Sequence, residues 1–171
     1  MREEGFSPFV VLDYLEETSA YALLYSMENA RNMEPAVLRA LNIREDDWSC
    51  NQNILIIDRL ELLPQLRGKN YGLACMRSAI RHFGVGCSIA AIKPFPLQNE
   101  AAFKDRTRPQ SPWSAQMQLD QFSASEVRST AKLRKYYSKL GFKSVKGTSL
   151  MVLNLDRPHQ GLPTLKEIGL N

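Results

Sequence analysis

The residues best suited to chemistry lie in a short loop, residues 67–72 (RGKNYG), that leads into an amphipathic helix. Two cations and two glycines stand at the start of this helix, where free backbone N–H groups and the positive end of the helix dipole attract anions. The glycines also let the backbone approach a ligand closely. The spacing fits neither Gly-x4-Gly-Lys-Ser/Thr nor Gly-x-Gly-x-x-Gly. We therefore expect residues 67–72 to hold a phosphate or diphosphate group.

A second pattern stands at residues 133–142 (LRKYYSKLGF), where Tyr137 precedes Gly141 by four residues. With the loop, it resembles the GNAT family of N-acetyltransferases, whose acetyl-CoA loop runs Arg/Gln-x-x-Gly-x-Gly/Ala. The resemblance covers residues 53–97 and 123–155. It implies an α/β (α+β) chain with the GNAT fold, a mixed central β-sheet flanked by helices. In this chain the N-terminal part is reduced and a long insertion precedes the last helix.

The resemblance also implies acetyl-CoA as the acyl donor and says which residues bind it. The loop backbone holds the diphosphate, and the preceding strand pairs with the pantetheine arm and polarises the thioester carbonyl through the N–H of Leu62. Thr130 stands where the family has Asn, and Asn70 stands where the family has Gly. Asn tolerates left-handed backbone, so the loop can still close. The full cofactor-binding set is Leu60, Glu61, Leu62, Arg67, Gly68, Lys69, Asn70, Tyr71, Gly72, Thr130 and Tyr137.

Two side chains are the candidate catalytic groups, Tyr137 as general acid and Glu61 as general base. A phenol of ordinary pKa suits protonation of a thiolate. Neighbours on a helix point about 100° apart, so one tyrosine of the pair 136–137 faces the cofactor, and the alternative is that one or both pack in the core. For Glu61 the alternatives are an ion pair with Arg59, with Asp58 or water as the base.

The hydrophobic periodicity predicts the elements that position these residues. A buried strand ends at Pro64, because proline cannot donate to a ladder. Residues 98–122 read as a long loop with at most one helical turn, an insertion that covers the acceptor side with Phe103 and Trp113 as anchors, and the alternative is a mobile surface loop. The capping-box spacing of residues 123–126 starts the last helix. The predicted strands are 9–15, 21–27, 53–63, 87–97, 142–145 and 150–155, and the predicted helices are 34–42, 73–83 and 123–140.

Length and composition predict one cytoplasmic domain over residues 1–171, with an irregular tail from 156. We expect no membrane segment, no signal peptide and no metal, because no stretch is long and apolar enough and the two histidines are far apart. The three cysteines, Cys50, Cys75 and Cys87, have no metal or disulfide spacing and read as buried thiols.

Charge is divided unevenly along the chain. Residues 1–66 hold 5 basic and 12 acidic side chains, whereas residues 67–146 hold 15 basic and 4 acidic. The basic part begins at the phosphate loop, which suits a polyanionic cofactor and would also suit nucleic acid, a partner that the pattern does not favour.

These observations predict an acetyl-CoA-dependent N-acetyltransferase acting on a primary amine of a small molecule or protein. The alternatives are a non-catalytic GNAT-like module that binds CoA or a macromolecule, and a toxin-type acetyltransferase that modifies aminoacyl-tRNA. Acceptor identity, acyl-chain preference and oligomeric state do not follow from the sequence.

Overall fold

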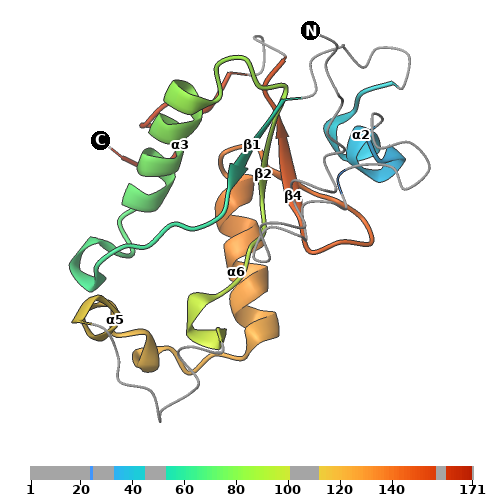
Figure 1. Cartoon of the computed structure of the whole chain (residues 1–171). Coiled ribbons are helices and arrows are strands. Elements are labelled where there is room, and N and C mark those ends of the chain that lie inside the picture. The colour runs from blue at the N-terminus through green and yellow to red at the C-terminus, as the bar shows by residue number, and fades with distance from the viewer. Residues whose placement is uncertain (1–23, 25–32, 45–52, 101–111, 157–160, 171) are drawn as a thin grey trace, which may run out of the picture. The chain divides into compact units, whose positions relative to one another are not determined.

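The computed structural model describes Leu24 and residues 33–44, 53–100, 112–156 and 161–170 (Figure 1). The chain divides into two compact units, each built from separate stretches of sequence. The first combines residues 1–58, 86–93 and 143–156, and the second combines residues 59–85, 94–142 and 157–171. The predicted strand 9–15 and Phe103 lie outside the described residues, and so does the predicted strand 21–27 except for Leu24, which is in a helical turn and not in a strand.

The first unit contains a four-stranded mixed sheet, which confirms the predicted mixed α/β architecture. Its strands are β1 (Ile54–Ile57), β2 (Ile89–Ile92), β3 (Lys143–Ser144) and β4 (Met151–Asn154), in the order β1-β2-β4-β3. β1 and β2 are parallel, and β4 is antiparallel to both β2 and β3. All four residues of β2 are buried, as the sequence predicts.

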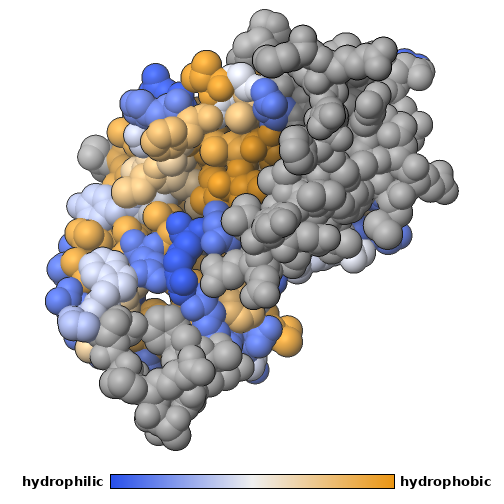
Figure 2. All heavy atoms as spheres, viewed as in Figure 1, coloured by the Kyte–Doolittle hydropathy of each residue, from blue (hydrophilic) through white to orange (hydrophobic). Residues whose placement is uncertain are grey.

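β1 is shorter than the predicted strand 53–63. It pairs with β2 only from Ile54 opposite Ile89 to Ile57 opposite Ile92, and residues 58–63 lie outside any strand. Pro94 has no N–H with which to extend the ladder, so β1 loses its partner where β2 ends. β1 is also only partly buried along its four residues. In the view of Figure 1, Figure 2 shows hydrophobic residues gathered over the region where β1 runs. The segment that carries the candidate base is therefore free of the sheet.

Helix α2 (Pro35–Leu41) confirms the predicted helix 34–42, and it packs on β3 and β4. Pro35 opens the helix, where its missing N–H costs nothing, and Asn42 ends it in a left-handed conformation. Leu38 and Leu41 are buried in the hydrophobic core of this unit.

The second unit contains the two long helices, α3 (Tyr71–Phe83) and α6 (Glu126–Ser138). α3 buries Leu73, Met76 and Ile80, and it ends at Gly84 as predicted. α6 begins at Glu126, later than the predicted Ser123. Its N-cap is Ser125, whose carbonyl accepts a hydrogen bond from Ser129 N–H, and no side chain caps the start of the helix. The capping-box prediction is therefore wrong.

Short helical turns replace most of the described part of the predicted 98–122 loop. They are η4 (Leu97–Asn99), α5 (Pro112–Met117) and η5 (Leu119–Gln121), and a further turn, η3 (Pro64–Leu66), precedes the phosphate loop.

The C-terminal segment 161–170 and the cysteines also bear on the sequence predictions. Arg77 of α3 donates to the Pro163 carbonyl at 2.6 Å, and Ile168 is buried, so this part of the tail packs on its unit.

Cys75 is exposed, which corrects its prediction as a buried thiol, and Cys87 is half-buried. None of the described helices combines the length and apolarity that a bilayer crossing requires.

Candidate functional site

The loop 67–70 is shaped by a helical turn before it and by two left-handed residues within it. In η3, Leu66 N–H donates to the Leu63 carbonyl at 2.9 Å and Arg67 N–H donates to the Pro64 carbonyl at 3.1 Å. Gly68 has φ +76° and Asn70 has φ +59°. A side chain is strained in this region except for Asn or Asp, so glycine at 68 and Asn at 70 both fit the backbone that the loop requires.

The backbone amides of residues 68–72 are the hydrogen-bond donors of this loop. In the part of the chain that the structure describes, no group accepts a hydrogen bond from these five amides. The next two amides, of Leu73 and Ala74, donate to the Asn70 carbonyl at 3.0 and 3.2 Å. The helix start therefore offers a run of donors of the kind that binds phosphate, whereas the Arg67 amide is already used.

Gly72 is the point where three elements of the site meet. A Cβ placed on Gly72 would lie 2.9 Å from the Tyr136 hydroxyl oxygen, 3.1 Å from a methyl of Leu62 and 3.5 Å from a methyl of Leu60. The absence of a side chain thus lets segment 59–63 and α6 approach the start of α3. The structure brings together Leu60, Leu62 and Gly72, which the sequence assigned to one binding site.

The two neighbouring tyrosines of α6 have different surroundings. The Tyr136 hydroxyl accepts a hydrogen bond from Leu73 N–H at 3.1 Å, and burial raises its pKa. Tyr137 is 8% exposed, and burial followed by the proximity of Tyr136 raises its pKa to about 12. Tyr136 therefore joins α6 to the helix start, and Tyr137 stays protonated at neutral pH. The general-acid role of Tyr137 stays a prediction.

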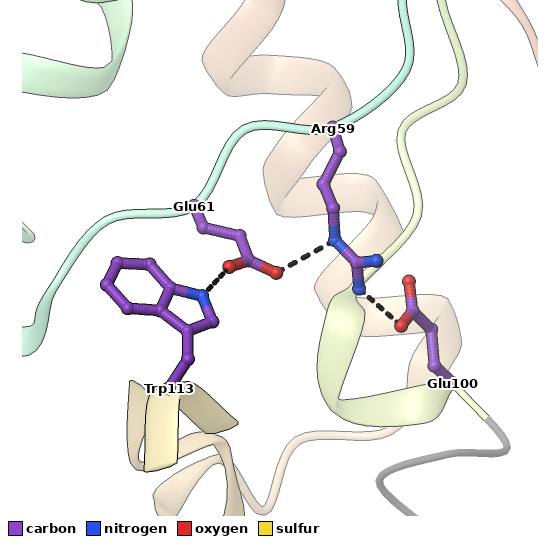
Figure 3. A network of polar contacts seen from close by, with 4 residues as sticks. All are labelled: Arg59, Glu61, Glu100 and Trp113. Carbon is purple, nitrogen blue, oxygen red and sulfur yellow. Dashed lines mark hydrogen bonds and ion pairs between the residues drawn. The ribbon is translucent and has the colours of Figure 1, made fainter. Parts of the chain in front are cut away.

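Glu61, the candidate base, belongs to a network of four residues (Figure 3). Arg59 Nε lies 2.8 Å from Glu61 Oε1, and Arg59 Nη2 lies 2.5 Å from Glu100 Oε2. The Trp113 indole N–H donates to the other oxygen of Glu61. The ion pair with Arg59, one of the alternatives for Glu61, is therefore present, and its role as a base stays a prediction.

Arg59 bridges two stretches of chain that run in different directions, one carrying Glu61 and the other leading to Glu100 (Figure 3). Burial lowers the pKa of Arg59, but the hydrogen bond and charge of Glu100, with those of Glu61, outweigh it and raise the pKa overall. The guanidinium thus stays charged and holds both carboxylates.

The Arg67 side chain fastens the insertion rather than pointing to a ligand. Its Nε donates to the Leu62 carbonyl at 2.8 Å, and its Nη2 donates to the Met117 carbonyl at 2.5 Å. The guanidinium carbon also lies 5.2 Å from the centre of the Phe122 ring. Burial lowers the pKa of Arg67, but an arginine remains charged at neutral pH. With Trp113 on Glu61, this gives α5 and η5 two attachments to segment 59–67.

The remaining predicted binding residues lie at the edges of this arrangement. Lys69 is exposed, Tyr71 is 40% exposed, and Thr130 lines a surface pocket of about 340 Å³ on α6 together with Glu126, Val127, Ala131 and Arg134. Thr130 and Tyr137 are seven residues apart and share a helix face. Among the described side chains, no group of three or more His, Cys, Asp or Glu could hold a metal ion.

Comparison of the chain with protein-family models, curated proteins and solved structures finds no match.

Sequence reasoning missed three features of the site. Glu100 belongs to no motif in the sequence, and only the structure shows that it pairs with Arg59. The Met117 carbonyl is a backbone group that any residue could supply, so no residue type marks it. The third feature is the hydrogen bond of the Tyr136 hydroxyl to the start of α3, for which the adjacent tyrosine pair 136–137 is the one sequence signal. Trp113 was predicted as an anchor of the insertion, and its hydrogen bond to Glu61 confirms that.

Proposed function

We propose that the protein has a GNAT fold and is an N-acetyltransferase that uses acetyl-CoA to acetylate a primary amine of a small molecule or protein. The observation that carries this proposal is the run of amides at residues 68–72, at the start of a 13-residue helix. Their geometry supports diphosphate binding, because consecutive N–H groups and the helix dipole act on the same anion. The cations of residues 67–146 add a favourable field for a polyanion.

The segment before the loop supports the same proposal. Residues 58–63 lie outside the sheet, so their backbone groups are not used in a strand ladder. An extended ligand arm can bind to such a segment as an added strand. In this proposal Leu60, Glu61 and Leu62 bind the arm, and Leu62 N–H faces the carbonyl that gains negative charge.

Acetyl-CoA is a substrate here: it supplies the acetyl group as a thioester, and its thiol leaves as the carbon–nitrogen bond forms. Glu61 accepts the proton of the attacking amine, directly or through a water. Tyr137 carries a proton throughout the neutral range and donates it to the leaving sulfur. Its pKa of about 12 lies above that of an ordinary thiol, so transfer to a free thiolate would be uphill. In this proposal the proton therefore moves to the sulfur while the carbon–sulfur bond breaks, and the phenolate regains a proton from solvent.

The experiment is a thermal-shift titration followed by a thiol-release screen of amines and peptides. Acetyl-CoA and CoA should both stabilise the protein, by about 2.7 kcal/mol at a hundredfold excess over Kd. Pantetheine, which lacks the diphosphate, is the matched control and should have little effect. Absence of any shift with acetyl-CoA would remove the proposal.

Two variants then separate binding from chemistry. Tyr137→Phe and Glu61→Gln should each reduce kcat by about a hundredfold while leaving the Kd of acetyl-CoA within about twofold. Unchanged kcat in either variant would reject the role of that residue without touching the binding proposal.

A further inference from the structure

A row of four cations runs along the exposed face of α6 and its C-cap: Arg128, Lys132, Lys135 and Lys139. Their spacing of i, i+4, i+7 and i+11 puts them on one side of the helix. All four are exposed, and the buried residues of the helix, Ser129 and Tyr137, lie away from them. We call this row the basic stripe.

The stripe is not explained by interactions within its own helix. Glu126 is the only acidic residue of α6, and it belongs to the face that lines the Thr130 pocket. Neighbouring like charges at i, i+3 and i+4 destabilise a helix, and a cation in its first turn, such as Arg128, opposes the dipole. Lys135 in the last turn and Lys139 at the C-cap are favoured by the dipole. The structure pairs none of the four cations with an acidic residue in the described part of the chain. The helix dipole therefore accounts for Lys135 and Lys139, but helix stability does not account for a row of like charges that runs the length of the helix.

We propose that the basic stripe is a docking surface for the sugar–phosphate backbone of an RNA strand. At 1.5 Å per residue, successive cations follow each other at about 4.5 to 6 Å along the helix axis. A regular row of single positive charges matches a regularly repeating anion better than the irregular carboxylates of an acidic protein. The phosphates of an A-form strand lie closer together than those of B-form DNA, so RNA fits this short spacing better.

The composition of the stripe also says how the RNA is recognised. None of its four side chains is aromatic, so the stripe offers no platform on which bases stack. Lysine contacts phosphate as a point charge and reads no base edge there. Binding through the stripe is therefore electrostatic and independent of base sequence, and it does not depend on the proposed acetyl transfer.

The test uses fluorescence anisotropy of the full chain with a labelled A-form RNA duplex at a series of salt concentrations. A variant with Arg128→Gln, Lys132→Gln, Lys135→Gln and Lys139→Gln removes the stripe and keeps helix propensity. The matched control, with Arg39→Gln, Lys143→Gln, Lys146→Gln and Lys166→Gln, removes the same charge from exposed positions elsewhere. Circular dichroism and thermal unfolding establish that both variants are folded.

We expect the stripe variant to lose more than tenfold in affinity at low salt, and the control to lose much less. The slope of log affinity against log salt should flatten by about 0.9 for each lost contact with a duplex phosphate, about 3.6 for four contacts. Equal losses in the two variants, an unchanged slope, or no RNA binding by the natural chain at low salt would overturn the proposal. Equal or tighter binding of DNA of the same sequence, or of polyglutamate, would overturn the assignment to RNA.

Discussion

At the scale of single residues, the site depends on a position that has no side chain. Gly72 lies within van der Waals reach of Tyr136, Leu62 and Leu60, so the start of α3, segment 59–63 and α6 converge on one Cα. The sequence assigned Gly72 to ligand approach. The structure shows a second reason for glycine there, which is the packing of the protein on itself.

Gly72→Ala should destabilise the protein by about 1 to 3 kcal/mol, because the new methyl group would lie 2.9 Å from the Tyr136 oxygen. Urea unfolding measures this loss. In a Tyr136→Phe background the oxygen is gone, so the same substitution should cost less, and the double-mutant cycle should show a coupling energy of about 0.5 kcal/mol or more. Strictly additive losses would mean that the two groups do not meet.

Tyr137 should make the stability depend on pH in the alkaline range. Its pKa is near 10 in the unfolded chain and about 12 in the folded one, so between these values only the unfolded state loses the proton. Stability is then fully present below pH 10 and falls as the pH rises toward 12, by about 2 to 3 kcal/mol.

Tyr137→Phe is the control for this effect, since it keeps the ring and removes the titrating group. The free energy of unfolding, measured from pH 8 to 12, should fall less steeply in the variant by about that amount. Identical pH profiles would show that the phenol of Tyr137 is not buried in solution.

At the scale of elements, the insertion is fastened at two places. Arg67 joins the Leu62 carbonyl to the Met117 carbonyl, and Trp113 joins α5 to Glu61. Helix α5 has only six residues, too few to be stable by itself. Its structure therefore depends on these attachments.

Arg67→Lys should release α5 and η5 while keeping the positive charge. Lysine lacks the planar fork that reaches two carbonyls at once, so we expect a loss of about 1 to 3 kcal/mol. Hydrogen exchange should become faster in residues 112–122 and stay unchanged in β2 and β4. Lys69→Gln, at an exposed position of the same loop, is the control and should change stability by less than about 0.5 kcal/mol. Unchanged exchange in residues 112–122 would show that another contact holds the insertion.

At the scale of the whole molecule, charge and chain connectivity are the features that follow from the sequence. The excess of basic residues over 67–146 includes both the phosphate loop and the basic stripe of α6. One stretch of chain thus carries both proposed anion-binding surfaces. Acetyl-CoA and RNA are separate ligands in these proposals, so a variant of the stripe tests one without removing the other.

The sequence by itself determined the elements whose signals are local. Pro35 and Asn42 bound α2, the apolar spacing of Leu73, Met76 and Ile80 makes α3 amphipathic, and the apolar run of β2 makes it a buried strand. Residues within one or two helical turns, or along one strand, supply all of these signals.

Only the tertiary structure decided which groups meet across long stretches of chain. The end of β1 depends on where its neighbour β2 runs into a proline, and the partners of Arg67 and Glu61 lie 50 and 52 residues further along the chain. Which tyrosine reaches the start of α3 depends on how α6 is rotated in its packing. Such contacts are set by burial and hydrogen-bond geometry in three dimensions, and periodicity along the chain does not encode them.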